Sequence, residues 1–101
     1  MKTVATRFAP SPTGPLHIGG VRTALFNWLY SKNKGGKFYL RIEDTDKERS
    51  KEEFKDQIIN SLKWIGINYE DSEYIQSDKI DDHINVANEL LKKGLAYKCY
   101  C

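Results

Sequence analysis

Residues 7–20, RFAPSPTGPLHIGG, contain all three prolines of the chain and three of its seven glycines. Before this run, Val4, Thr6 and Phe8 alternate with other residues, which predicts a short strand over residues 4–9. After it, apolar residues recur at helical spacing from residue 16 to about residue 34, where a Gly-Gly pair ends the predicted helix. Such a loop can hold a phosphate chain against free backbone N–H groups at the helix N-terminus.

The next two elements repeat this order of strand and helix. Residues 37–43 are predicted to form a second strand whose apolar face carries Phe38, Leu40 and Ile42. Ser50-Lys-Glu-Glu53 has the pattern of a capping box, which predicts a helix N-terminus at this point. Apolar residues at helical spacing follow, and Gly66 ends the helix.

The last part of the chain is less regular. Residues 68–77 are predicted to be mostly loop, residues 80–94 a third helix, and residues 95–99 are compatible with the start of another strand. The order of elements predicts an α/β protein in which a parallel sheet is connected by right-handed crossover helices. Ligands bind at the carboxyl ends of such strands, so we expect the loops at 9–15 and 43–49 to lie close together.

The composition is that of an ordinary globular protein, with 40% hydrophobic and 30% charged residues in 101. A net charge of +2 does not by itself indicate a nucleic-acid partner. No run approaches the roughly 20 apolar residues of a membrane span, and no secretory signal is visible, so we expect a cytoplasmic protein without a membrane partner.

Cys99 and Cys101 do not make a secreted disulfide framework. Because the chain stops on Cys101, we expect a piece of a longer protein.

The loop after the first strand carries candidate phosphate-binding residues. Pro10 and Pro12 stiffen the backbone, and His17 is expected in the first turn of the helix. There its imidazole can donate hydrogen bonds to charge that develops on a transferring phosphoryl group. Gly19 and Gly20 have no side chain, so a base or a ribose can approach the backbone closely. The alternative interpretation is a proline-rich turn followed by a histidine at a helix start.

A second group of charged residues follows the second strand, in Arg41-Ile-Glu-Asp-Thr-Asp46. Arg41 and Glu43 are expected on the face opposite to the apolar residues, and Arg7 at the end of the neighbouring strand. An arginine and a glutamate so placed can hold the carboxylate and the ammonium group of an amino acid. The alternative is a cross-strand Arg–Glu pair beside a turn formed by aspartate and threonine.

The two segments together resemble a known family. RFAPSPTGPLHIGG at 7–20, RTALFNWLYSKNKGGKFYLRIEDTDKERS at 22–50, YIQSD at 74–78 and ELLKKGLAYKCYC at 89–101 are similar to the bacterial-type glutamyl-tRNA synthetases, which are class I aminoacyl-tRNA synthetases. The resemblance implies that residues 1–101 form the first half of a Rossmann-like nucleotide-binding fold. It implies that this portion of the catalytic domain ends where the insertion that binds the acceptor stem of tRNA begins.

The resemblance also implies roles for single residues. His17, Gly19 and Gly20 match the ATP-binding signature, with His17 as the catalytic candidate. Gly20 occupies the position where many class I enzymes have a second histidine, a departure that is frequent in the glutamate subgroup. Arg7, Ser11 and Glu43 match the glutamate-binding positions of the family. Arg7 and Glu43 agree with the charge argument above, whereas Ser11 comes from the resemblance alone.

The implied activity is the ATP-dependent attachment of L-glutamate to tRNA(Glu) through a glutamyl-adenylate, with Mg²⁺ accompanying the triphosphate. The lysine-rich ATP loop and the anticodon-binding domain of the family are absent from these 101 residues. We therefore expect this chain to be inactive alone and favour a monomer. The alternatives are the paralogue that glutamylates the queuosine base of tRNA(Asp), and a non-catalytic fragment that binds nucleotide or tRNA.

Two further sets of residues remain open. Cys99 and Cys101 resemble the first half of a zinc knuckle, but structural zinc takes four ligands and His83 is expected at the surface, so two reduced cysteines are the alternative. Asp44 and Asp46 either assist near ATP or the tRNA end, or form a turn.

Overall fold

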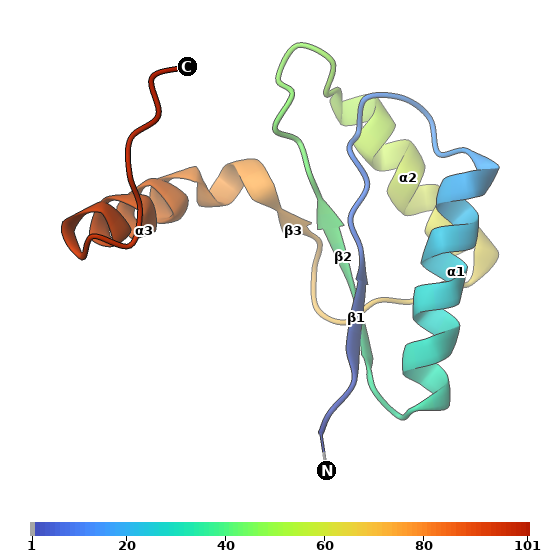
Figure 1. Cartoon of the computed structure of the whole chain (residues 1–101). Coiled ribbons are helices and arrows are strands. Elements are labelled where there is room, and N and C mark those ends of the chain that lie inside the picture. Colours follow the sequence, from blue (N-terminus) through green and yellow to red (C-terminus); the bar gives the residue numbers. More distant parts are fainter. Residues whose placement is uncertain (1) are drawn as a thin grey trace.

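The computed structural model describes residues 2–101 and contains three parallel strands. Their order in the sheet is β1-β2-β3, so each strand lies beside its successor in sequence (Figure 1). The strands are β1 (Ala5–Phe8), β2 (Lys37–Ile42) and β3 (Tyr74–Ile75). The helices are α1 (Ile18–Asn33), α2 (Glu52–Ile65), the short 3-10 helix η1 (Gln76–Lys79) and α3 (Ile80–Lys92). The α/β class predicted from the sequence is confirmed.

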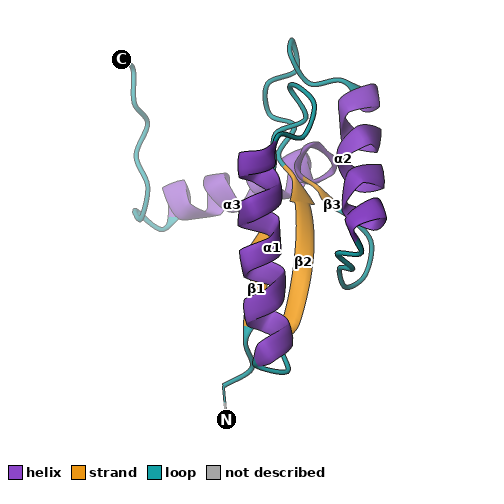
Figure 2. Ribbon diagram, turned by 90° about the vertical axis from the view of Figure 1, so that its right-hand side faces the viewer, coloured by secondary structure: helices purple, strands orange, loops and turns teal. Residues whose placement is uncertain are grey.

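Helices α1 and α2 cover the same face of the sheet, as the two ribbon views agree (Figures 1 and 2). The burial along β2 alternates, so its three apolar side chains point into a core and Tyr39 and Arg41 point away from it. Each large apolar side chain so buried contributes about 1.5–3 kcal/mol. The core consists of Phe8, Ala24, Phe38, Leu40, Ile42, Ile58, Leu62 and Ile67. The opposite face of the sheet carries the side chains of Tyr39 and Arg41.

The turn between α1 and β2 depends on glycine for two different reasons. Gly35 has a φ of +63°, a conformation that costs other residues free energy. Gly36 lies against β1: a Cβ atom built there would be 2.2 Å from the carbonyl oxygen of Val4. That same oxygen accepts a hydrogen bond from the N–H of Lys37 at 3.0 Å, which begins the pairing of β1 with β2.

The predicted capping box is wrong. The residue before α2 is Lys51, which makes no side-chain capping bond, and the Oγ atom of Ser50 is buried without a hydrogen-bond partner. The N–H of Ser50 instead donates to the carbonyl of Asp46 at 2.8 Å, and that of Lys51 to the carbonyl of Pro12 at 3.1 Å. Ser50 therefore belongs to the preceding turn, and α2 begins only after the chain has contacted the first loop.

The last part of the chain differs from the expectation in two further places. Residues 74–75, predicted as loop, form β3 and pair with Arg41 and Ile42 of β2. A two-residue strand is too short to show the alternation by which strands are recognised in sequence. Residues 95–99 form no strand.

Helix α3 projects away from the sheet (Figures 1 and 2), and none of its residues is buried. The radius of gyration of 16.3 Å exceeds the roughly 13 Å expected for a compact domain of this length, because α3 does not pack on the core. Within residues 2–101, no helix is both long and apolar enough to span a membrane.

Candidate functional site

The two predicted loops meet at the carboxyl ends of β1 and β2, as the parallel topology requires. The carbonyl oxygen of Pro10 accepts a hydrogen bond from the N–H of Glu43 at 2.9 Å, and the carbonyl oxygen of Pro12 accepts from Lys51 at 3.1 Å. Pro12 is fully buried between them. Backbone hydrogen bonds therefore join the first loop to both ends of the second loop, and the candidate residues of both segments share one edge of the sheet.

His17 is the N-cap of α1 rather than a residue of its first turn. Its Nδ1 atom accepts a hydrogen bond from the N–H of Gly20 at 3.3 Å. A neutral imidazole in this arrangement carries its proton on Nε2, which is then available as a donor to a ligand. The ring is exposed, and the first turn of α1 contains no acidic residue to offset the positive end of the helix dipole. This end of the helix favours an anion.

Gly19 and Gly20 are both close to neighbouring side chains. A Cβ atom at Gly19 would lie 3.1 Å from the ring of His17, and one at Gly20 would lie 2.9 Å from the Cδ1 atom of Leu16. A side chain at Gly19 would therefore press on the imidazole itself. The approach of a base or a ribose to these glycines stays a prediction.

The predicted charge group assembles around Glu43. Its Oε1 atom lies 3.4 Å from Nε of Arg41 and 4.0 Å from Nη1 of Arg7. The Arg7 side chain is 57% exposed and the Glu43 side chain 35%, so both groups remain accessible. Ser11 is exposed in the first loop, where its carbonyl accepts a hydrogen bond from the N–H of Thr13 at 2.9 Å. The cross-strand contact of the alternative interpretation, between Arg7 and Glu43, is present at 4.0 Å, and the Arg7 side chain remains exposed at the edge of the sheet.

Asp44 and Asp46 bind donors of the protein itself. Asp44 accepts hydrogen bonds from the N–H of Ser77 at 2.9 Å and from its hydroxyl at 2.5 Å, which connects the second loop to η1. Asp46 accepts from Nε of Arg49 at 2.6 Å, and this contact holds the pKa of the Asp46 carboxyl below its usual value. Turn formation therefore accounts for Asp46, whereas Asp44 makes a long-range contact that the sequence alone did not indicate.

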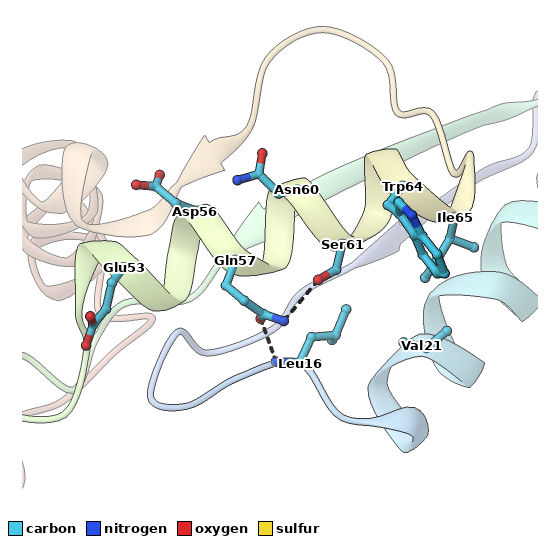
Figure 3. Close-up of a pocket in the computed structure, with 9 residues that line it drawn as sticks. All are labelled: Leu16, Val21, Glu53, Asp56, Gln57, Asn60, Ser61, Trp64 and Ile65. Carbon is cyan, nitrogen blue, oxygen red and sulfur yellow. Dashed lines mark hydrogen bonds between the residues drawn. The ribbon is translucent and has the colours of Figure 1, made fainter.

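A second contact missed by the sequence lies on the other side of the first loop. The N–H of Leu16 donates to Oε1 of Gln57 at 2.8 Å, and Nε2 of Gln57 donates to the hydroxyl of Ser61 at 3.0 Å (Figure 3). The segment that leads into His17 is thus fixed to α2. These residues border a groove of about 770 Å³ between α1 and α2, beside the highly exposed Trp64 (Figure 3).

The cysteines lie away from this edge. The sulfur atoms of Cys99 and Cys101 are 3.0 Å apart and share a hydrogen bond, which lowers the pKa of the Cys99 thiol. His83 is exposed on α3, as expected, and its Nε2 atom is 3.5 Å from the hydroxyl of Tyr74. In residues 2–101 no group of three or more potential ligands comes together, so these residues do not fit a complete four-ligand zinc site. The half-site stays a prediction.

Comparison with known proteins identifies the family of this chain. Residues 3–101 match the family model described as tRNA synthetases class I (E and Q), catalytic domain. The chain is 80% identical over all its residues to the glutamate–tRNA ligase of Pelagibacter ubique, and it covers 22% of that protein. It is 62% identical to glutamate–tRNA ligase 2 of Wolbachia pipientis subsp. Culex pipiens, of which it also covers 22%.

Solved structures give the same result. The crystal structure of a glutamate tRNA ligase from Elizabethkingia meningosepticum, in complex with its amino acid, superimposes with a TM-score of 0.82 at 44% identity. The match covers 90% of this chain and 20% of that one. The chain therefore spans about a fifth of the length of the relatives it matches. It belongs to the class I tRNA synthetases for glutamate and glutamine, within their catalytic domain.

Proposed function

We propose that this chain forms the ATP- and glutamate-binding part of a glutamate–tRNA ligase, which attaches L-glutamate to tRNA(Glu). The observation that carries the proposal is the hydrogen bond from Glu43 to Pro10, which brings the charged residues around Glu43 and the loop that leads into α1 to one edge of the sheet. The relatives named above are glutamate–tRNA ligases, which favours this reaction over glutamylation of a queuosine base.

Glutamate is proposed to bind at the ends of β1 and β2. The Glu43 carboxylate suits the ammonium group of the substrate, and the guanidinium of Arg7 suits a carboxylate. Ser11, exposed between them in sequence, offers a hydroxyl. Because Arg7 is 4.0 Å from Glu43, beyond hydrogen-bond distance, its donors are available to a ligand.

ATP is proposed to lie with its phosphates at the N-terminus of α1. A glutamate carboxylate oxygen attacks the α-phosphorus, the bond to the bridging oxygen breaks, and pyrophosphate leaves as glutamyl-adenylate forms. A ribose hydroxyl of the terminal adenosine of tRNA then takes the glutamyl group, and AMP leaves. The protein contributes position and charge stabilisation, with Nε2 of His17 as a donor. Asp44 and Asp46 already accept hydrogen bonds within the protein, so we assign neither as a Mg²⁺ ligand.

The glutamate site can be tested with Glu43→Gln in a full-length enzyme that contains this sequence. Loss of a charge-assisted contact of about 1.5–3 kcal/mol should raise the KM for glutamate about 10- to 100-fold. The KM for ATP should change much less, because the phosphates lie at α1. Both constants come from glutamate-dependent ATP–pyrophosphate exchange with tRNA(Glu) present.

Glu48→Gln is the matched control, because Glu48 is an exposed glutamate of the same loop. It should leave both constants within about twofold of the unmodified enzyme. Equal rises of the glutamate and ATP constants in the Glu43 variant would contradict the ammonium contact.

A further inference from the structure

Arg41 lies near the carboxyl end of the middle strand β2, on the sheet face that α1 and α2 leave uncovered. It pairs in register with Tyr74 of β3, and its guanidinium carbon is 5.4 Å from the centroid of the Tyr74 ring. The two side chains line one hollow of about 440 Å³, together with Arg7 and Tyr39. An arginine at this distance from an aromatic face is attracted to the ring, which limits the directions its side chain can take.

The two arginines near Glu43 differ in how they are held. Arg41 is closer, with its Nε atom 3.4 Å from Oε1 of Glu43, against 4.0 Å for Nη1 of Arg7. The Arg41 side chain is 32% exposed and its Nε atom is fully buried without a hydrogen-bond partner in residues 2–101, so Arg41 acts on Glu43 through its charge, whereas the Arg7 side chain is 57% exposed. The Arg41 side chain is thus packed against the sheet, whereas the Arg7 side chain is a solvent-exposed cation at its edge.

We propose that Arg41, held by Tyr74, is the positioning residue that fixes the Glu43 carboxylate for the substrate ammonium group and thereby leaves Arg7 to the substrate. Without Arg41, the closest cation to Glu43 is Arg7, and a hydrogen-bonded pair in place of their present contact of 4.0 Å would occupy both groups at once. The role of Arg41 is therefore exerted through Glu43. This inference rests on the proposed glutamate site.

Tyr74 acts in this arrangement through its ring rather than its hydroxyl. The backbone of β3 places the ring opposite Arg41, and the hydroxyl points to His83 on α3 at 3.5 Å, beyond ordinary hydrogen-bond distance for an oxygen donor. Tyr74→Phe should consequently preserve glutamate binding, whereas Tyr74→Leu should weaken it.

The test is a double-mutant cycle in a full-length enzyme that contains this sequence, assayed by ATP–pyrophosphate exchange with tRNA(Glu) present. Arg41→Gln should raise the KM for glutamate about tenfold, and Tyr74→Leu about two- to fivefold, with kcat and the KM for ATP within about twofold. In a Glu43→Gln background, Arg41→Gln should add less than about twofold, because its effect passes through the carboxylate.

Lys32→Gln is the matched control: Lys32 is also a cation beside an aromatic ring, at 6.0 Å from the Trp28 centroid, but at the far end of α1. It should change no constant. The inference is overturned if Arg41→Gln raises the glutamate KM equally in both backgrounds, or if it lowers kcat alone. If Glu43→Gln itself leaves the glutamate KM unchanged, the proposed glutamate site fails first, and the two failures are thereby distinguished.

Discussion

Replacing His17 with alanine should slow glutamyl-adenylate formation by roughly 10²–10³-fold in a full-length enzyme that contains this sequence, as for loss of one donor to a developing charge. The expected size of the effect follows from the position of the ring. Nδ1 accepts from the N–H of Gly20, so Nε2 is fixed as the donor, and it lies at the positive end of a helix without acidic residues in its first turn. The measurement is the rate of pyrophosphate exchange at saturating ATP and glutamate.

Two variants separate this donor from the capping function of the same ring. His17→Ser keeps a side-chain oxygen that can cap α1 but offers no group that reaches the phosphates. Its exchange rate should be as low as that of His17→Ala, while its thermal stability should match the unmodified enzyme. His83→Ala, which removes the exposed histidine of α3, should leave the rate unchanged. Full exchange activity in His17→Ser would show that capping, and not the donor, is the role of His17.

The positions of the site residues follow largely from patterns visible in the sequence. Alternation of Phe38, Leu40 and Ile42 predicted β2 and placed Arg41 on its other face, as found. Glu43, expected on the same face, directly follows β2 and lies 3.4 Å from Nε of Arg41. The parallel topology then predicted the meeting of two loops that are distant in sequence. Local periodicity suffices for these predictions because each depends on neighbours within one element and on a general rule of connection.

The contacts that fix the loops could not be predicted in the same way. The pair of Asp44 with Ser77 spans 33 residues, and that of Leu16 with Gln57 spans 41. No periodicity links such positions, and a polar residue that serves a distant loop has the same pattern as one exposed to solvent. The YIQSD block was the only signal near Ser77, and it came from resemblance rather than from spacing.

These long-range contacts explain how a loop rich in proline and glycine can serve as a binding site. Gln57 holds the backbone of Leu16, one residue before His17, while Pro10 and Pro12 bond to the second loop. The loop is therefore supported from α2 and from the end of β2 before any ligand arrives. A site whose groups are already oriented loses less entropy when it binds, which is the condition for strong charge stabilisation.

The sheet edge that carries this site depends on a single glycine at the opposite end of the molecule. Gly36→Ala should destabilise the fold by about 3 kcal/mol or more, which exceeds the usual effect of a point substitution. Its Cβ would lie 2.2 Å from the Val4 carbonyl oxygen, a backbone atom that cannot rotate away. Relief requires separation of β1 from β2, and the hydrogen bond from Lys37 to Val4 would break first.

Gly35→Ala is the control, because the adjacent glycine has a φ of +63° but open space around its Cβ position. It should cost about 1–2 kcal/mol from backbone strain alone. The comparison uses the midpoint of the first urea-induced unfolding transition of a full-length enzyme that contains this sequence. Because β1 ends beside Arg7 and β2 beside Glu43, Gly36→Ala should also raise the KM for glutamate, whereas Gly35→Ala should not. Equal midpoints for the two variants would show that the sheet accommodates the added carbon, and that the close approach at Val4 does not set the register of β1 and β2.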